Sequence, residues 1–264
     1  MTNRKRKQQA HRIAKRGEFS GLQEQVQELH AQLSLIAQQT QRSYLTSIAR
    51  DTRPNSNSAL FGGLVKRAID RSIEIVESEM PDAMIFDNTF EMLRYVLSKA
   101  DPNGAHAEFG VFSGKTIRLF AAARPDVRFD GFDSFEGLPE EWSGWQPFDF
   151  DVNGVPPEVP ENVKLHIGWF EDTIPGYVDS IDTMSFMHVD CDIYSSTVTI
   201  FDALFDKIKP GTVIVFDEYF CYPNFEQHER RAFAEYLERS GHIANWVAVC
   251  GQRAACLIQA GTGR

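Results

Sequence analysis

Short apolar runs alternate with segments of helical period from residue 105 to residue 259, and this alternation constrains the fold more than any other feature of the 264-residue chain. The pattern predicts strands at 105–112, 127–133, 162–167, 184–190, 212–217, 244–250 and 254–259, and helices at 115–124, 195–208 and 226–240. Strands that alternate with helices form a mostly parallel sheet whose two faces are covered. The sequence therefore predicts an α/β domain over residues 105–264 that binds its ligand at the carboxyl ends of the strands.

Residues 54–104 are predicted to be a linker and a helical lead-in to this domain. Pro, Asn and Gly residues between Asp51 and Gly63 indicate a linker. Apolar residues then recur at helical spacing from Ile85 to Leu97, and Asp101–Gly104 is a stop signal.

Residues 1–53 are predicted to be a basic tail followed by a short helix. One side of that helix carries apolar residues with a period of 3.5, at Leu22, Val26, Leu29, Leu33 and Ile36. Two interpretations stay open: residues 19–40 form a coiled coil that makes a homodimer, or an amphipathic helix that lies on its own domain.

Charge is distributed unevenly and limits the classes of partner. Residues 1–53 hold ten Lys or Arg and four acidic residues, a net charge of +6, whereas the whole chain carries −10. The remainder therefore carries −16, which argues against nucleic-acid binding because phosphate contacts require Lys and Arg. An acidic body suits a cationic ligand or a divalent metal ion.

Further features of the sequence predict a cytoplasmic protein. No apolar run approaches the roughly 20 residues that a membrane span needs, and no apolar core follows the basic N-terminus as in a secretory signal. The cysteines form no C-x-x-C pair and are expected to be reduced thiols; they are Cys191, Cys221, Cys250 and Cys256.

A glycine-containing segment, residues 108–116, follows the first strand and opens a helix. It lacks the G-x-G-x-x-G pattern of a dinucleotide fold. Its Gly-Lys-Thr end matches a P-loop ATPase, but the first glycine of that motif should stand where Phe109 is. The third interpretation is a methyltransferase loop, in which Glu108, Gly110 and Gly114 hold the amino-acid end of the cofactor.

The end of the second strand favours the methyltransferase interpretation. Asp133 lies 23 residues after Gly110, close to the roughly 20 residues expected for an acid that binds ribose hydroxyls. The alternative role of Asp133 is to cap a helix. Ser134 follows it and is included among the expected cofactor contacts. Trp169, after the third strand, is expected either near adenine or in the core.

Acidic residues follow two strands that are expected to end side by side. Asp190 follows the strand at 184–190, and Asp217 and Glu218 follow the strand at 212–217. Buried carboxylates are costly unless a cation compensates them, and Mg²⁺ prefers oxygen ligands. The alternative is that one acid is a general base and another caps the next helix. His228 is a further candidate base or an exposed residue, whereas His188 is expected to be a core histidine.

The segment from Leu138 to Asn162 is unusually long and irregular for a connection in a compact domain. It holds five prolines and two tryptophans. Two interpretations stay open, a lid over a pocket and a surface insertion. The aromatic residues that favour a lid are Trp142, Trp145, Phe148 and Phe150.

Over residues 85–258 these motifs together resemble the S-adenosylmethionine-dependent O-methyltransferases related to macrocin and mycinamicin sugar methyltransferases. The resemblance rests on the segments 131–139 (GFDSFEGLP), 189–194 (VDCDIY), and 210–211 (PG) leading to 217–219 (DEY). It implies a Rossmann-like class I methyltransferase fold, with a seven-stranded sheet whose last strand is antiparallel. It also implies S-adenosylmethionine as cofactor and dependence on Mg²⁺.

The resemblance also implies roles for individual residues. Glu108, Gly110 and Gly114 would hold the methionine end of the cofactor and Asp133 its ribose. The metal would lie at Asp190, Asp217 and Glu218, and Asp192 would be the base near the reacting hydroxyl. This chain departs from the family in having Asp217-Glu218 where paired aspartates are common, and in its Phe112-Ser113 and Lys115 around the glycine loop.

The sequence thus predicts an enzyme that methylates a hydroxyl of a sugar, a glycan or a small natural product, with Asp190, Asp192 and His228 as candidate catalytic residues. Two other classes stay open. One is a non-catalytic scaffold that keeps the cofactor fold, against which the clustered acids argue because a scaffold need not bury them. The other is the P-loop ATPase.

Overall fold

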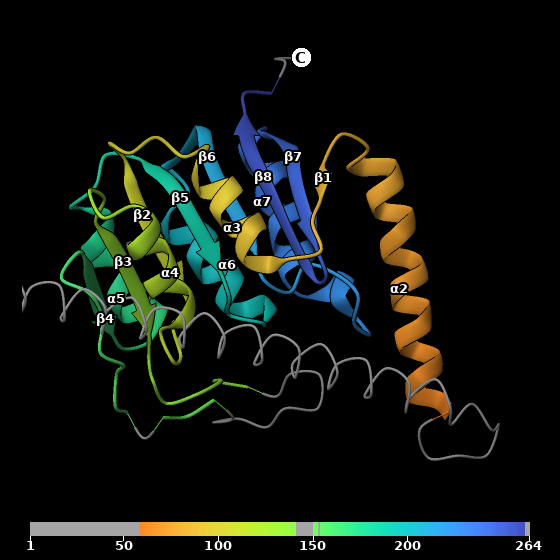
Figure 1. The fold of residues 1–264 in the computed structure, drawn as a ribbon, viewed down its shortest axis with the longest axis horizontal. Coiled ribbons are helices and arrows are strands. Elements are labelled where there is room, and N and C mark those ends of the chain that lie inside the picture. Colours follow the sequence, from red (N-terminus) through yellow and green to blue (C-terminus); the bar gives the residue numbers. More distant parts are fainter. Residues whose placement is uncertain (1–58, 141–149, 153, 262–264) are drawn as a thin grey trace, which may run out of the picture. The chain divides into compact units, whose positions relative to one another are not determined.

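An eight-stranded sheet, with the strand order β1-β7-β8-β6-β5-β2-β3-β4, forms the centre of the protein (Figure 1). The computed structural model describes residues 59–140, 150–152 and 154–261, and residues 64–264 form a compact unit of their own. The basic tail and the predicted helix at 19–40 lie outside the described residues. No helix in the described part of the chain is long and apolar enough to cross a membrane.

The strands are short and the helices cover both faces of the sheet. The strands are β1 (Met84–Ile85), β2 (Ala105–Phe109), β3 (Phe129–Asp133), β4 (Val163–Ile167), β5 (Met184–Val189), β6 (Ile208–Phe216), β7 (Ile243–Cys250) and β8 (Arg253–Gln259). The helices are α2 (Ala59–Glu79), α3 (Thr89–Leu97), α4 (Lys115–Ala123), α5 (Phe170–Val178), α6 (Tyr194–Ala203), the 3₁₀ turn η1 (Phe225–Gln227) and α7 (Glu229–Ser240).

The predicted α/β fold is confirmed. All seven predicted strands are present, and β8 is the strand that runs antiparallel to both of its neighbours, β6 and β7. The other pairings among the described strands are parallel. The carboxyl ends of β2, β3, β5 and β6 consequently lie along one edge of the sheet.

The structure differs from the sequence prediction in four segments. Ile85 belongs to β1, an eighth strand that pairs with β7, and not to the lead-in helix. Residues 59–63 are the start of α2 and not linker. Helix α5 was not predicted, because Pro175 and Gly176 interrupt its pattern. Helix α6 ends at Ala203, and β6 begins at Ile208, before the Pro-Gly pair that was expected to precede it.

Two apolar clusters lie on opposite faces of the sheet. Side chains of α2, α5, α6 and α7 pack on one face, and those of α3 and α4 pack on the other. Central strand β5 is buried along its whole length, as expected for a parallel strand covered on both sides. Alternate residues of β6 enter the two clusters, Ile214 and Phe216 on one face and Val213 and Val215 on the other.

Helix α2 offers a matched test of this packing. Ile75 is fully buried, whereas Ile73, on the same helix, is 52% exposed. We expect Ile75→Ala to lower the free energy of unfolding by about 2–4 kcal/mol, because it leaves a cavity against the sheet. Ile73→Ala should change it by less than about 0.5 kcal/mol. Urea denaturation of both variants measures the difference, and equal losses would show that α2 is not anchored through Ile75.

Candidate active site

The strand register places the predicted site residues along one edge of the sheet. Glu108 of β2 is paired with His188 of β5, and His188 is paired with Val215 of β6. The residues that follow these strands, among them Gly110 and Asp190, therefore leave the sheet at the same level. The edge joins the glycine loop after β2 to the acidic residues after β5 and β6.

Gly110 brings the glycine loop into direct backbone contact with the end of β5. Its φ is +94°, and a Cβ atom at this position would lie 1.7 Å from the carbonyl oxygen of Asp190. The amide of Asp190 donates to the carbonyl of Phe109 at 2.8 Å, and the amide of Gly110 donates to that of Phe132 at 2.9 Å. Only glycine fits this conformation and this close approach.

Asp133 organises the glycine loop from the end of β3. Its Oδ2 accepts from the amides of Val111 and Phe112, each at 2.7 Å, and its Oδ1 accepts from the amide of Phe135 at 2.7 Å. A carboxylate offers about four acceptor positions, so one remains on Oδ1. The predicted contact with a ribose hydroxyl is compatible with this arrangement, but the structure does not test it.

The other predicted cofactor contacts lie around the same turn. Gly168 donates from its amide to the carbonyl of Asp133 at 3.0 Å, which brings the end of β4 to that of β3. Trp169 follows as the N-cap residue of α5 and is partly buried. Ser134 is buried, and its hydroxyl accepts from the amide of Glu136 at 3.1 Å.

The described part of the long 138–162 segment packs on the glycine loop. Arg118 donates to the carbonyls of Glu158 and Ser113, each at 2.7 Å. The rings of Phe112 and Phe150 meet edge to face, with their centroids 5.7 Å apart. The described part of this segment therefore lies beside the glycine loop, where the cofactor is expected. Trp142, Trp145 and Phe148 lie outside the described residues, so the choice between a lid and a surface insertion is not tested.

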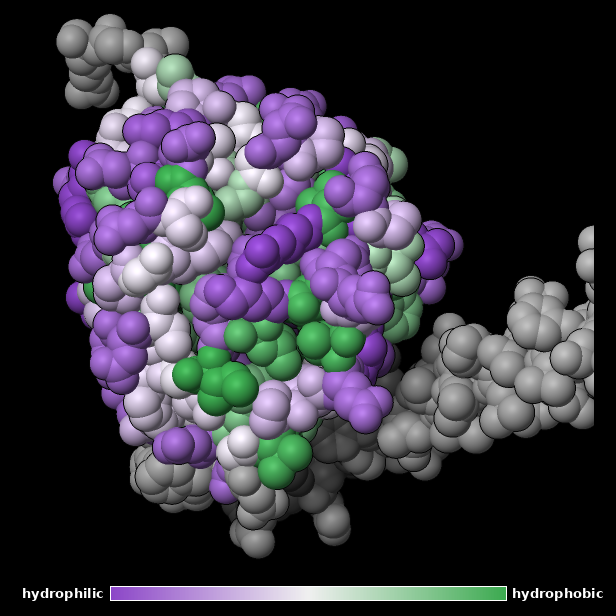
Figure 2. All heavy atoms as spheres, turned by 90° about the vertical axis from the view of Figure 1, so that its left-hand side faces the viewer, coloured by the Kyte–Doolittle hydropathy of each residue, from purple (hydrophilic) through white to green (hydrophobic). Residues whose placement is uncertain are grey.

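Apolar side chains are exposed on and around this loop. Phe112 is 44% exposed and Phe150 is 37% exposed. Val155, on the long segment, and Ile167, at the end of β4, are more exposed still. Figure 2, which views the molecule from the β4 side, shows apolar side chains gathered on this face among hydrophilic ones.

Below the edge, a chain of polar side chains crosses four adjacent strands. The Nδ1 of His188 lies 3.0 Å from Oε1 of Glu108, and its Nε2 lies 3.4 Å from Oδ1 of Asp217. Arg253 of β8 donates from Nε and Nη2 to the two oxygens of Asp217, each at 2.6 Å. We refer to Glu108, His188, Asp217 and Arg253 as the ionic ladder.

The ladder fixes the charge of its two central members. Burial disfavours a charge on His188, but the adjacent carboxylates of Asp217 and Glu108 outweigh it and raise the pKa of the imidazole to about 10. Burial acts against ionisation of Asp217 as well, but His188 and Arg253 outweigh it and lower the pKa of this carboxyl to about 2. His188 is therefore a buried imidazolium beside an ionised Asp217.

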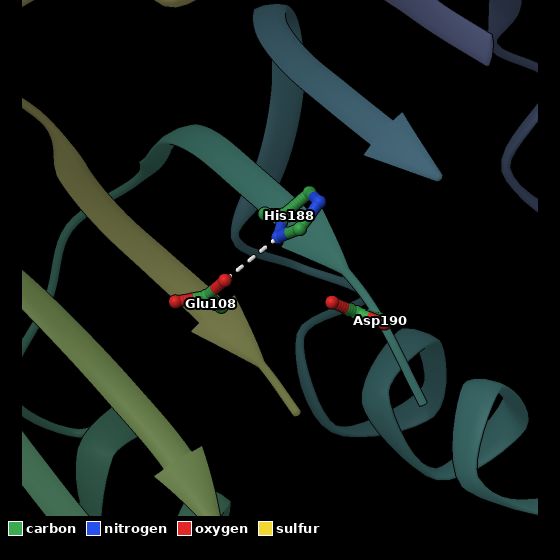
Figure 3. Close-up of side chains that lie close together, drawn as sticks. All are labelled: Glu108, His188 and Asp190. Carbon is green, nitrogen blue, oxygen red and sulfur yellow. Dashed lines mark hydrogen bonds and ion pairs between the residues drawn. The ribbon is translucent and has the colours of Figure 1, made fainter. Parts of the chain in front are cut away.

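Glu108, His188 and Asp190 also bring potential metal-ligand atoms within 4.8 Å of one another (Figure 3). A protonated imidazole has no free lone pair for a metal ion. In Figure 3 the ring of His188 is directed at Glu108 through a hydrogen bond. Glu108 and His188 of this group are therefore members of the ionic ladder, whereas Asp190 is not.

A second group, Asp190, Asp192 and Glu218, brings three carboxylates within the same distance of 4.8 Å. All three residues are partly exposed. Burial, followed by the neighbouring carboxylates, raises the pKa of Asp190 and Glu218 well above their usual range. Burial also raises the pKa of Asp192 to about 6. We refer to these three residues as the acid cluster.

Glu229 lies against the acid cluster from the first turn of α7. It is fully buried, and its Oε2 accepts from the amide of Glu218 at 3.3 Å. Within the described residues, its Oε1 and the Oε2 of Glu218 are buried without a hydrogen-bond partner. Burial raises the pKa of Glu229, and the negative charges of Asp192 and Asp190 raise it further. The cluster is thus a site where a cation would be stabilised.

Two predicted site residues, Asp217 and His228, are not members of the acid cluster. Asp217 belongs to the ionic ladder and not to the acid cluster. His228 precedes α7, partly buried, with its ring centroid 6.1 Å from that of Tyr222. Burial lowers the pKa of His228. Its Nδ1 has no hydrogen-bond partner among the described residues.

Sequence reasoning missed the roles of Arg253, His188 and Glu229. The register pairs Phe216 with Ala254 in antiparallel fashion, which puts Arg253 opposite Asp217. That signal appears only once β8 is known to lie beside β6. His188 and Asp190 are two residues apart, so they share one side of β5, and this was the available signal for His188.

Comparison with known proteins finds O-methyltransferases. The model of the family described as Macrocin-O-methyltransferase (TylF) matches residues 158–245. The 8-demethyl-8-(2,3-dimethoxy-alpha-L-rhamnosyl)-tetracenomycin-C 4'-O-methyltransferase of Streptomyces olivaceus is 27% identical over 177 residues, which cover 58% of this chain and 67% of that relative. Over these segments the chain is similar to the macrocin-O-methyltransferase family.

Solved structures of two methyltransferases confirm the fold. The O-methyltransferase NovP matches with a TM-score of 0.51 and 20% identity over 65% of this chain and 79% of its own. The calicheamicin methyltransferase CalS11 matches with a TM-score of 0.50 and 21% identity over 84% of this chain and 91% of its own. The family model and the relative from Streptomyces olivaceus identify the protein as an S-adenosylmethionine-dependent O-methyltransferase, as predicted.

Gly110→Ala tests the contact between the glycine loop and Asp190. We expect it to lower the free energy of unfolding by about 2 kcal/mol or more, since it adds a clash and a strained φ. Binding of S-adenosylhomocysteine should weaken in parallel. The control Gly176→Ala, at a helical glycine with nothing within 4 Å, should be neutral or stabilising by up to about 1 kcal/mol. Urea denaturation and calorimetry measure both; a Gly110→Ala variant that matches its control would contradict the contact.

Proposed function

We propose that this methyltransferase acts on a hydroxyl group of a sugar or a sugar-bearing natural product and that a Mg²⁺ ion assists the reaction. One observation carries the proposal: the backbone of Gly110, in the glycine loop, packs directly on Asp190 of the acid cluster. A cofactor on the loop would therefore present its methyl group to an acceptor held at the cluster.

The acid cluster fits a divalent ion. Carboxylate oxygens are the ligands that Mg²⁺ prefers, and three carboxylates lie within 4.8 Å of one another. The buried Oε2 of Glu218 has no hydrogen-bond partner among the described residues, which is costly without a cation. Asp190, Asp192 and Glu218 would hold the ion. When bound there, it would polarise the acceptor hydroxyl and lower its pKa.

The residues of this chain supply alignment and proton removal. Asp133 and Gly110 shape the loop that would hold the cofactor, with Glu108, Gly114, Ser134 and Trp169 as further candidate contacts. Asp192, whose carboxyl pKa is raised to about 6, is ionised at neutral pH, and the oxygen that it does not give to the ion can accept the proton of the hydroxyl. His228, neutral because burial lowers its pKa, is the second candidate base.

The acceptor class is proposed from the relatives and from the surface of the site. The relative from Streptomyces olivaceus is described as a 4'-O-methyltransferase of a rhamnosyl-tetracenomycin. Carboxylates suit the hydroxyls of a sugar as hydrogen-bond acceptors. The exposed rings of Phe112 and Phe150 suit an apolar part of the same molecule.

Asp133→Ala tests the cofactor position. The variant loses the proposed ribose contact and the acceptor for three loop amides, so we expect affinity for S-adenosylhomocysteine to fall by about tenfold to a hundredfold. Asp126→Ala, an exposed acid before β3, is the control and should bind as the parent protein does. Calorimetric titration measures both, and unchanged affinity in Asp133→Ala would exclude Asp133 from the cofactor site.

Methyl transfer to deoxysugars, nucleotide-linked sugars and glycosylated natural products, followed by mass spectrometry, tests the acceptor class and the metal together. We expect a product with one added methyl group, whose formation stops on chelation and returns with Mg²⁺. Glu218→Gln should weaken Mg²⁺ binding about tenfold or more, whereas Glu238→Gln, at an exposed position on α7, should not. Turnover that is indifferent to chelation would refute the metal and leave the transferase intact.

A further inference from the structure

Building on the proposed function, we propose that Arg253 and His188 are positioning residues that hold Asp217 out of the ion site. In this arrangement Asp217 is an internal counter-ion of the protein, and Asp190, Asp192 and Glu218 alone carry the metal ion. The inference revises the ligand set that the sequence motif suggested, in which Asp217 was a ligand.

Arg253 engages Asp217 through both carboxylate oxygens. The donors Nε and Nη2 lie 2.6 Å from Oδ1 and Oδ2, which is the two-pronged geometry of the strongest carboxylate pairs. The side chain of Asp217 is only 8% exposed, so water competes little with the pair. The Nε2 atom of His188, on the adjacent strand β5, lies 3.4 Å from the same Oδ1 atom.

The backbone builds this pair. The antiparallel register of β6 and β8 sets Ala254 against Phe216, so the next residues outward, Asp217 and Arg253, face each other across the strands. The amide of Tyr219 also donates to the carbonyl of Gln252 at 2.9 Å. The segments that carry Asp217 and Arg253 are thus tied together on both sides of the pair.

The position of Asp217 follows from this attachment. Its oxygens are not part of the group of three carboxylates within 4.8 Å of one another. An ion bound to Asp217 would lie close to the guanidinium of Arg253, which pairs with both carboxylate oxygens, and like charges repel each other. An ion held by the other three carboxylates avoids this repulsion.

The ladder also explains how these charges can be buried at all. Arg253 and His188 compensate Asp217, and Glu108 contacts the far side of His188. The members come from or directly follow β2, β5, β6 and β8, which are adjacent in the sheet. The ladder therefore holds Asp217 from two directions. The negative charge of the acid cluster has no counter-ion within the ladder.

Calorimetric titration of the full-length protein with Mg²⁺, without cofactor, tests the inference through a double-mutant cycle. Asp217→Asn alone leaves Arg253 unpaired near the ion and should weaken Mg²⁺ binding about tenfold, whereas Arg253→Gln frees a carboxylate and should strengthen it. The double variant D217N/R253Q removes both charges and keeps similar shapes. It should bind Mg²⁺ within about threefold of the parent protein. A loss of about tenfold or more in the double variant would show that Asp217 is a ligand and overturn the inference.

A second measurement needs no variant. In crystals of the parent protein soaked with Mn²⁺, anomalous scattering should locate the ion among Asp190, Asp192 and Glu218, with Arg253 still on Asp217. An oxygen of Asp217 at coordination distance from the ion would overturn the inference while leaving the proposed function in place. A parent protein that binds S-adenosylhomocysteine but neither Mg²⁺ nor Mn²⁺ would refute the metal in the proposed function, and the inference with it.

Discussion

The ion pair between Asp217 and Arg253 is the interaction on which the chemistry of this sheet edge depends. Carboxyl groups gather where β2, β5 and β6 end, and burying them without compensation would cost several kcal/mol each. Arg253 reaches Asp217 because β8 is antiparallel and turns back beside β6. The antiparallel last strand thus places the guanidinium of Arg253 beside the carboxylates that follow the parallel strands.

A second constraint, the contact between Gly110 and Asp190, joins the two halves of the site. The glycine loop and the acid cluster belong to different strands, yet their backbones touch. A displacement of either segment would displace the other, because close-packed backbone leaves no free space between them. Asp133 adds to this rigidity by holding the loop amides from β3. The donor and acceptor positions that we propose would thereby be fixed relative to each other, as an in-line displacement requires.

Part of the fold and of the site could be predicted from the sequence. The seven strands were visible as apolar runs, and Asp190 and Glu218 were expected together because both follow buried strands. Prediction failed where local pattern and tertiary context disagree. Pro175 interrupts the helical pattern of α5, so this helix was not predicted. Ile85 matches a helical spacing although it pairs with β7 in the sheet. Glu229 looked like an ordinary acid at the start of a helix, and only packing shows that it faces other carboxylates.

The sequence by itself determined the α/β class, the glycine loop and the acids that end the strands, because each depends on periodicity or on neighbours along the chain. Only the tertiary structure decided which carboxyl group faces which partner. Asp217 and Glu218 are adjacent in the chain, yet Asp217 meets Arg253 while Glu218 meets the acid cluster. The reason is that successive side chains at a strand end point to different sides. The order of the strands, which no local sequence pattern records, determines which side chains lie on each side.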